Sequence, residues 1–253
     1  MAEVPAAAQT LAVLSYLSRQ AAPVPAGLLA QALGIPRSTT YHLLGTMIEA
    51  GFVVHYPEDR AYGLGLAAYE LGTGYARQEP LQRLARRPLA DLSDRCRNSA
   101  HLCVLMQREV VYVIEERAPG RPLLITDVGL RLPAHATASG RAILAALPAA
   151  QVRALYPSAD AFAGGAPNTP STPSELRRRL VDVRREGVAL EQGEVTEGLS
   201  SMALAVLDTH DYPVAAVTVT YPEAETSGGR FAEIRHHLEA TVRLLTRRVA
   251  GRT

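Results

Sequence analysis

The sequence predicts an α+β protein of two parts, in which a small helical module ending in a β-hairpin precedes a larger domain built on an antiparallel sheet. Its 253 residues are 47% hydrophobic, enough for a substantial core and too many residues for one minimal module. Helical spacing followed by a hairpin pattern fills the first 65 residues, whereas strand and helix patterns alternate after Asn98. We therefore expect a first module over residues 1–65, a helical linker over 66–98 and a second domain over 99–253.

Composition narrows the class of protein without pointing to a partner. All 26 basic residues are arginine, and with 25 acidic residues the net charge is +1, so the charge balance alone gives no sign of nucleic-acid binding. Two cysteines favour a reducing compartment, and the pair His101 and Cys103 offers too few ligands for a metal site. No apolar run approaches the roughly 18 residues that span a bilayer, and the first residues lack a signal-peptide pattern. We expect a cytoplasmic protein without a membrane segment, a metal or a cofactor.

Three short helices are predicted in the first module. Leucines at helical spacing mark the first over Gln9–Arg19, and a second repeats the same period until Gly34 stops it. Pro36 suits the first position of a third helix, because its missing N–H would be unpaired there, and that helix extends to Gly51. Its predicted buried stripe consists of Leu43, Leu44, Met47 and Ile48.

Two short helices joined by a glycine-containing turn have the layout of a helix-turn-helix, whose second helix enters the major groove of DNA. A hairpin over residues 52–64, with a polar turn at Pro57–Arg60, would form a wing that includes Arg60 and Tyr62. A small helical bundle with an incidental hairpin fits the same spacing. The predicted DNA contacts at the exposed start of the second helix are Arg37, Ser38, Thr39, Thr40, Tyr41 and His42.

The charge of this module is unusual for a DNA-binding unit. Residues 1–64 contain three arginines and four acidic residues, a net charge of −1, whereas such units are usually basic. Placement is the counterargument, because Arg37 and Arg60 lie where a duplex would meet them, and hydroxyls and helix amides contact phosphate without adding charge. A ligand-gated module that binds protein rather than DNA therefore stays open.

The linker and the second domain follow from the same patterns. Helices are expected over Leu66–Tyr75 and Leu81–Cys96. Residues 81–97 contain five arginines and two aspartates, which form a basic face that either contacts phosphate or is solvated. Beyond it we expect an antiparallel sheet with helices, and a flexible loop over Ala159–Pro173. Predicted strands cover 101–107, 110–116, 188–191, 201–207 and 214–220, and predicted helices cover 140–147, 174–186 and about 231–249.

The predicted strands 201–207 and 214–220 each have one bulky face and one small, polar face. Successive side chains of a strand point to opposite sides of a sheet. Bulky side chains fill a core, but small ones with hydroxyls leave a hollow for another element or a ligand. We hypothesise a ligand pocket at this face. The residues of this face are Ser201, Ala203, Ala205 and Leu207 of one strand and Ala216, Thr218 and Thr220 of the other.

A helix start provides a second wall for this hollow. Residues 137–140 (TASG) open a helix, whose unpaired amides favour a carboxylate or another acceptor, although an ordinary N-cap by Thr137 or Ser139 accounts for the same composition. Glu191 would accept hydrogen bonds from a ligand if it faces the hollow, whereas a lone glutamate at a strand end is usually solvated or ion-paired. Leu124 and Leu132 would cover an apolar part of the ligand, or serve only as core.

Three motifs follow one another in order along the chain, the first of them within the string from Gln9 to Leu64. They are LGIPRSTTY at 33–41 with AGFV at 50–53, LPAHATASGRA at 132–142, and Glu194 with Gly198 and SMA at 201–203. Together they resemble the winged helix, the pocket helix and the late signature of IclR-type bacterial transcription regulators. The resemblance implies a winged helix-turn-helix and a GAF-like effector-binding domain. It also implies a homodimer, often a dimer of dimers (a homotetramer), that binds operator DNA under the control of a small metabolite.

The resemblance also implies an effector site and marks departures from the family pattern. His42 stands where the family commonly has arginine, which bears on one DNA contact; Ser201 replaces a frequent cysteine and Ala205 a frequent proline, which bear on ligand preference or local rigidity. Three of the implied effector contacts also lie on the small polar faces described above. The implied contacts are Leu132, Ala138, Ser139, Glu191, Ser201, Thr218 and Thr220.

Enzymatic alternatives are weakly supported. Ser139 with His135 suggests a nucleophile and base, and Glu191 with Glu194 an acid–base pair. Neither pair has an assigned third partner, no G-x-S-x-G elbow occurs, and no glycine-rich loop precedes a lysine, because the chain contains no lysine. We expect that the protein is not an enzyme. A small-molecule hydrolase that uses His135 and Ser139 is the least favoured alternative.

The sequence thus predicts a ligand-responsive, DNA-binding transcriptional regulator. We expect a repressor of a catabolic operon that a small organic acid or an acyl or aromatic effector releases, while activation by the effector stays open. Its expected partners are double-stranded operator DNA, the small organic effector and further copies of the chain.

Overall fold

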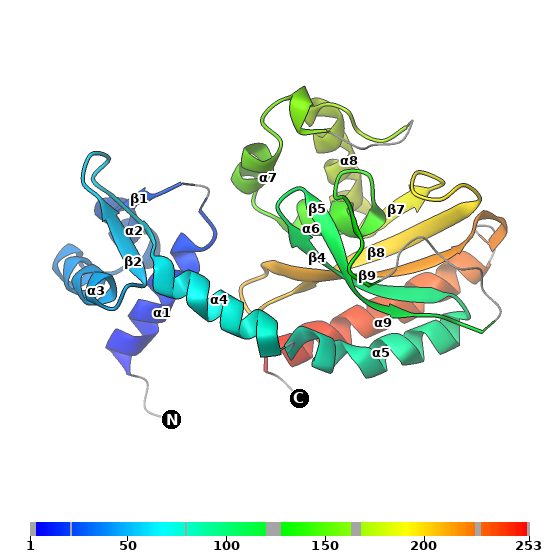
Figure 1. Cartoon of the computed structure of the whole chain (residues 1–253), viewed down its shortest axis with the longest axis horizontal. Coiled ribbons are helices and arrows are strands. Elements are labelled where there is room, and N and C mark those ends of the chain that lie inside the picture. Colours follow the sequence, from blue (N-terminus) through cyan, green and yellow to red (C-terminus); the bar gives the residue numbers. More distant parts are fainter. Residues whose placement is uncertain are drawn as a thin grey trace. The chain divides into compact units, whose positions relative to one another are not determined.

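The computed structural model describes residues 4–20, 22–78, 80–119, 128–162, 168–225 and 229–251. The chain divides between Pro80 and Leu81 into two units, each with its own core (Figure 1). This division lies inside the segment expected to be the linker; that residues 66–98 act as a linker stays a prediction. Among the described residues, no helix is both long and apolar enough to cross a membrane.

The first unit is the predicted winged helix-turn-helix. Its core joins all three N-terminal helices to the wing through Val13, Leu29, Leu44 and Val53. The strands form an antiparallel sheet in the order β1-β3-β2. The elements are α1 (Pro5–Leu17), β1 (Val24–Pro25), α2 (Ala26–Leu33), α3 (Arg37–Glu49), β2 (Val53–Tyr56), β3 (Ala61–Leu64) and α4 (Leu66–Gln78).

Several predicted boundaries in this unit differ from the structure. Helix α1 begins at Pro5, four residues before the expected Gln9, because a proline at the first position of a helix loses no hydrogen bond. Pro36 is the extended N-cap of α3 (ψ 141°) rather than its first helical residue. Strand β1 was not predicted; its two residues pair with Ala61 and Tyr62 of the wing.

The buried stripe of α3 is rotated relative to the prediction. Thr40, Leu44 and Met47 face the core, whereas Ile48, expected in the stripe, is 39% exposed. The observed spacing of four and then three residues follows one face of a helix, and Ile48 lies at the edge of that face. The turn before α3 is as predicted: Gly34 adopts a left-handed conformation (φ 63°), and buried Ile35 anchors it.

The second unit is built on a six-stranded antiparallel sheet with the strand order β6-β5-β4-β9-β8-β7. The predicted α+β class with an antiparallel sheet is confirmed. The short edge strand β6 was not predicted, because three residues ending in proline give no alternating pattern. The strands are β4 (Ser99–Met106), β5 (Glu109–Glu116), β6 (Arg131–Pro133), β7 (Ala189–Gln192), β8 (Leu199–Leu207) and β9 (Pro213–Pro222).

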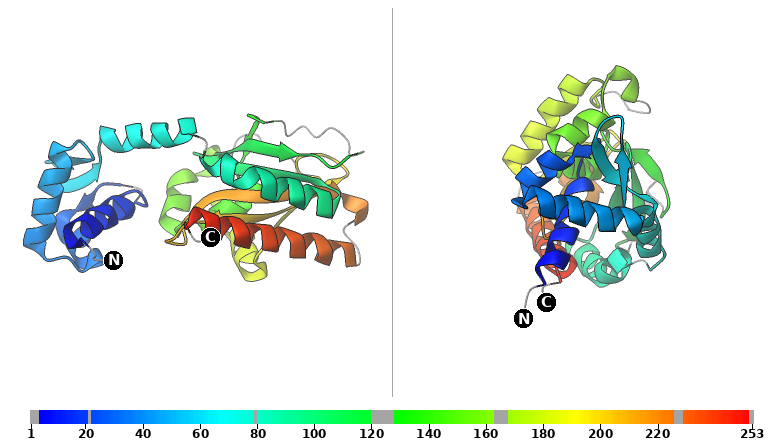
Figure 2. Two further views of the ribbon diagram at one scale, coloured as in Figure 1. Left: turned by 90° about the horizontal axis from the view of Figure 1, so that it is seen from below. Right: turned by 90° about the vertical axis from the view of Figure 1, so that its left-hand side faces the viewer.

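Helices cover both faces of this sheet (Figures 1 and 2). Bulky residues of β8 and β9, such as Met202 and Val217, pack against α5 and α9, while Ala203 and Ala216 face α6. The prediction of one bulky and one small face is therefore confirmed. The helices are α5 (Pro80–Cys96), α6 (Ala138–Ala146), α7 (Ala149–Leu155), α8 (Pro173–Glu186) and α9 (Gly229–Val249), with short 3₁₀ turns η1 (Ala159–Ala161) and η2 (Glu223–Glu225). The short helix α7 was not predicted.

Candidate functional site

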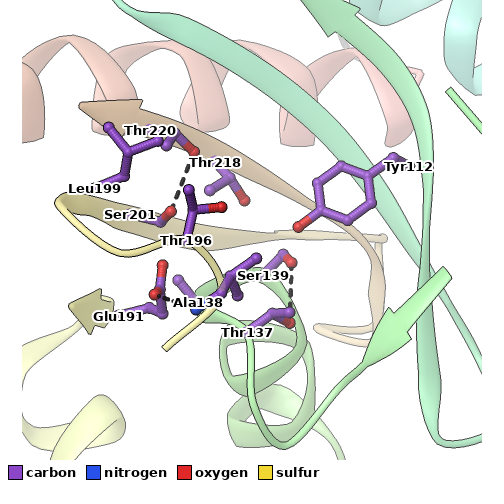
Figure 3. Close-up of a pocket in the computed structure, with 11 residues that line it drawn as sticks. Tyr112, Thr137, Ala138, Ser139, Glu191, Thr196, Leu199, Ser201, Thr218 and Thr220 are labelled. Carbon is purple, nitrogen blue, oxygen red and sulfur yellow. Dashed lines mark hydrogen bonds between the residues drawn. The ribbon is translucent and has the colours of Figure 1, made fainter. Parts of the chain in front are cut away.

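A pocket lies between the start of α6 and the small faces of β8 and β9 (Figure 3). The enclosed cavity is small, about 20 Å³, which is room for one or two water molecules, so the side chains around it would have to move apart to admit a larger ligand. Six residues predicted from the sequence converge on it from four elements. They are Ala138, Ser139, Glu191, Ser201, Thr218 and Thr220.

Two predicted ligand contacts are not found at this pocket. Leu132 does not line it: β6 pairs Leu132 with Val110, and the Leu132 side chain packs against the core on the α6 side of the sheet. Leu124 lies outside the described residues, as does part of the predicted loop Ala159–Pro173. Five lining residues were not predicted as ligand contacts: Tyr112, Thr137, Val195, Thr196 and Leu199.

The start of α6 combines a side-chain cap with free backbone amides. Thr137 Oγ1 accepts a hydrogen bond from the Gly140 N–H at 3.0 Å, and the Ser139 hydroxyl lies 3.3 Å from it. The N-cap is therefore real, but the amides of Ala138 and Ser139 have no intrahelical acceptor, as in any first turn. Gly140 permits this geometry, because a Cβ there would lie 2.1 Å from the Ala134 carbonyl oxygen. The helix thus presents amide donors to the pocket.

Glu191 is a buried wall of the pocket rather than a surface group. Only 3% of the residue is exposed, and Oε1 accepts a hydrogen bond from the Val195 N–H at 2.9 Å. Burial raises the pKa of Glu191, and this effect outweighs the lowering by hydrogen bonds from the Val195 amide and the Ser201 hydroxyl. The carboxyl group therefore has an increased tendency to be neutral.

Hydroxyl groups line the sheet side of the pocket. Ser201 Oγ and Thr220 Oγ1 lie 3.1 Å apart, and buried Thr218 Oγ1 has no hydrogen-bond partner within the described part of the chain. The Tyr112 hydroxyl points into the pocket (Figure 3). Burial raises the pKa of the adjacent Cys103 thiol to about 12, although the Ser139 and Thr218 hydroxyls oppose this shift, so Cys103 is an unreactive neighbour.

A buried ion pair holds the loop that closes one side of the pocket. Arg141 of α6 donates to Glu194 Oε2 at 2.6 Å and to the Leu190 carbonyl oxygen at 2.5 Å, and both side chains are more than nine-tenths buried. The loop after Glu194 supplies the lining residues Val195 and Thr196. Sequence patterns gave no signal for this pair, because its members lie 53 positions apart.

His135 and Ser139 do not form the base–nucleophile pair that the hydrolase alternative requires. Neither ring nitrogen of His135 has a hydrogen-bond partner among the described residues, so no base is bonded to Ser139. His135 instead packs edge-on against Tyr156 and Phe162, with ring centroids 5.9 and 5.1 Å away. Burial, together with the positive charge of Arg141, lowers its pKa, which is the behaviour of a neutral core histidine.

The first turn and a half of α3 divides into exposed and buried positions. Arg37, Ser38, Tyr41 and His42 are exposed, and Thr39 is half-buried. Thr40, predicted to contact DNA with its neighbours, is instead 1% exposed, and its hydroxyl donates to the Pro36 carbonyl oxygen at 3.1 Å. Its side chain is therefore unavailable to a duplex. Helical periodicity explains the difference, because position 40 shares a face with the core residue Leu44.

The wing presents the other two predicted contacts. Arg60, at the exposed tip, adopts a left-handed conformation (φ 48°), and Tyr62 stacks on His55 with ring centroids 4.6 Å apart. Partial burial raises the pKa of Tyr62, and the neighbouring Tyr41 adds to the shift. His55 was not predicted, but its cross-strand position opposite Tyr62 was available from the hairpin register.

Comparison with known proteins places both units in one family. Residues 6–57 match the IclR helix-turn-helix domain, and residues 73–247 match the C-terminal domain of IclR bacterial transcriptional regulators. The glycerol operon regulatory protein of Streptomyces coelicolor is 31% identical, over 88% of this chain and 85% of that protein. The transcriptional repressor IclR of Escherichia coli is 27% identical, over 88% and 82%.

A solved structure supports the same assignment at the level of the fold. The crystal structure of Thermotoga maritima IclR superposes with a TM-score of 0.64 and 22% identity, over 98% of this chain and 99% of that one. The C-terminal family match alone covers more than half of the 253 residues. The chain therefore belongs to the IclR family and is a DNA-binding, ligand-responsive transcriptional regulator.

Proposed function

We propose that this regulator is a cytoplasmic repressor, without enzymatic activity, whose operator affinity falls when a small organic acid or acyl compound fills the pocket beside α6. The observation that supports this best is the convergence of six predicted positions, from α6, β7, β8 and β9, on one partly enclosed space. Relatives named for repression and for the glycerol operon favour a repressor of a catabolic operon.

The donors around the pocket suggest the class of effector. The amides at the start of α6 suit a carboxylate or carbonyl oxygen, because a helix N-terminus has partial positive charge. Glu191 with a raised pKa repels such a carboxylate less than an ionised glutamate would. The hydroxyls of Ser201, Thr218 and Thr220 would contact a second polar group, and Tyr112 would flank an apolar or aromatic part.

On the DNA side, two copies of the winged helix would read paired half-sites. Exposed Arg37, Ser38, Tyr41 and His42 would contact bases or phosphates from α3, and Arg60 and Tyr62 would contact the backbone from the wing. Thr39 would be a marginal contact, since it is half-buried.

Self-association is supported by apolar residues that a monomer leaves in water. Leu11 of α1 is 63% exposed, and Leu66, Tyr69 and Leu71 of α4 are 65–73% exposed. Surface of this kind is typical of interfaces. We propose that these helices contribute to a homodimer, and that dimers pair further into a dimer of dimers.

The effector site is tested by a thermal-shift screen of small acids, amides and aromatic acyl compounds on the full chain, because a ligand of the folded state raises the unfolding temperature. The double substitution Ser201→Ala and Thr218→Val should weaken the best ligand by about tenfold or more, since each lost hydrogen bond costs about 1 kcal/mol. Thr209→Val, at a hydroxyl outside the pocket, is the matched control. An unchanged affinity in the double variant would show that these hydroxyls do not line the effector site.

A further inference from the structure

The second unit has a concentrated basic surface where α5 begins and α9 ends. The two helices run antiparallel on one face of the sheet (Figure 1), and Arg248 Nη1 donates to the Leu84 carbonyl oxygen at 3.0 Å. Leu81 of α5 and Leu245 of α9 belong to the same core cluster, which fixes this end of the helix pair. We call its arginines the basic patch: Arg83, Arg86, Arg87, Arg243, Arg247 and Arg248.

The patch is exposed, and acidic residues are scarce along the two helix segments that carry it. All six arginines are exposed, and the chain has no aspartate or glutamate from residue 80 to 90 or from 240 to 251. Arg83, Arg86, Arg87 and Arg247 have no ion pair or hydrogen bond with any residue that the structure describes. Among the described residues, the only carboxylate within 4.0 Å of a patch arginine is that of Glu239, which lies 3.6 Å from Arg243 Nη1.

Helix α9 itself shows that exposed arginines in this fold can have acidic partners. In the first half of α9, Arg230 pairs with Glu233 at 2.7 Å and Arg235 with Glu239 at 2.8 Å, one helical turn apart. Such pairs offset the repulsion between like charges on a helix surface. Residues 80–90 of α5 and 240–249 of α9 contain no acidic residue, so every arginine of the basic patch except Arg243, which pairs with Glu239, remains available to an anionic partner.

Charge on the first unit indicates which partner this is. Residues 1–80, which include the winged helix-turn-helix, contain four arginines and six acidic residues, a net charge of −2. Attraction of cations to the phosphate backbone supplies much of the affinity of DNA-binding proteins, and this unit has a deficit of cations. A family member that binds DNA with an acidic reading unit needs positive charge from elsewhere in the chain.

The connection along the chain is short enough for the patch to supply that charge. Only Gly65, α4 and Glu79 separate the last strand of the wing from α5. Helix α4 has 13 residues and is therefore about 20 Å long, less than one turn of B-DNA. Arginine also suits phosphate, because its planar guanidinium group donates two parallel hydrogen bonds.

We propose that the basic patch binds the phosphate backbone of the same DNA duplex that the winged helix-turn-helix reads. The second unit then has two roles: it binds the effector, and it contributes to DNA affinity independently of the DNA sequence. Specificity stays with α3, because phosphate contacts position a protein without reading bases.

The salt dependence of DNA binding tests this directly, because phosphate contacts release counterions. Full-length protein would be titrated into a fluorescent duplex of about 40 base pairs with an unrelated sequence, at several KCl concentrations. The triple variant R86Q/R87Q/R247Q should lower the slope of log K against log [KCl] by about 1 per arginine, and weaken binding at about 100 mM salt by tenfold or more. The charge-preserving variant R86K/R87K/R247K should retain the slope.

A matched control separates local contacts from overall charge. R153Q/R177Q/R178Q removes three exposed arginines from α7 and α8 of the same unit, and should leave the slope near that of the wild type. Thermal unfolding of each variant checks that the fold is intact. An unchanged slope in the patch variant, or an equal loss in the control, would overturn the proposal while leaving DNA reading by α3 intact. The first of these outcomes would point to an acidic protein as the partner of the patch.

Discussion

The two units of this regulator present their functional side chains in opposite ways. In the first unit, the proposed DNA contacts are mostly exposed and come from two short segments, the start of α3 and the wing. In the second unit, the pocket residues are largely buried and come from strands and a helix that lie up to 108 positions apart, as with Tyr112 and Thr220. Surface contacts can therefore change with little effect on folding, whereas the pocket is linked to the stability of its unit.

The largest expected effect is on that stability. Arg141→Met would leave Glu194 and the Leu190 carbonyl oxygen buried without their partner, and should lower the free energy of unfolding of the second unit by about 3–5 kcal/mol. Denaturant unfolding of the full chain would measure it. The exposed ion pair of Arg185 with Asp182 is the control, and Arg185→Met should change stability by well under about 1 kcal/mol. Equal effects at both sites would contradict the difference between buried and exposed pairs.

The second effect concerns DNA and should leave stability untouched. Arg37→Ala removes an exposed cation at the start of α3 and should weaken specific DNA binding by about 1–3 kcal/mol, or roughly tenfold to a hundredfold. Fluorescence anisotropy would give the affinity and thermal unfolding the stability. Unchanged affinity for the cognate DNA would show that α3 does not present this residue to the duplex.

A smaller effect follows from the pKa of Glu191. Because burial raises this pKa, the folded state holds the proton to higher pH than the unfolded chain, so stability falls as pH rises from the usual carboxyl range through the raised value. Glu191→Gln should remove that slope. A profile that is the same in the variant would mean that Glu191 does not titrate in a buried site.

Glu115, in the same unit, should give stability the opposite dependence on pH. Burial opposes its ionisation, but hydrogen bonds from His101 and Arg117 lower the pKa of Glu115 to about 2. Its contribution to stability is therefore present above the usual carboxyl pKa and is lost as pH falls toward 2. Comparison of E191Q with E115Q in acid unfolding would separate the two contributions.

The smallest effect is expected at Thr40. Thr40→Val keeps the shape of a buried side chain and removes only a bond to the Pro36 carbonyl oxygen within the same helix turn. DNA affinity should stay within about twofold of wild type, in contrast to Arg37→Ala. A loss comparable to that of Arg37→Ala would mean that Thr40 reaches DNA after all.

Local patterns were sufficient for most of the secondary structure and for half of the pocket. The helix-turn-helix followed from Gly34, Pro36 and leucine spacing, and the small faces of β8 and β9 followed from simple alternation. Thr40 was misplaced because a position beside exposed contacts can still face the core. Within a short segment, the sequence therefore indicates the helical period more reliably than it indicates which positions face the core.

Contacts between distant segments could not be predicted from pattern. Tyr112 lies in a strand of alternating apolar residues, and only the pairing of β5 with β4 brings it to the pocket. The Arg141–Glu194 pair and the loop residues Val195 and Thr196 depend on how β7 and β8 lie beside α6. Leu132 was assigned to the ligand because an apolar residue near a pocket motif has the same sequence signal whether it lines the cavity or the core.

The central claim is that occupancy of the pocket beside α6 controls binding of DNA by the winged helix. The most direct measurement is the affinity of the full chain for DNA from upstream of its own gene, with and without the acid that gives the largest thermal shift. We predict salt-sensitive, sequence-specific binding that the acid weakens in the wild type but not in the Ser201→Ala, Thr218→Val variant. Absence of specific binding at low salt, or an equal response in the variant, would contradict it.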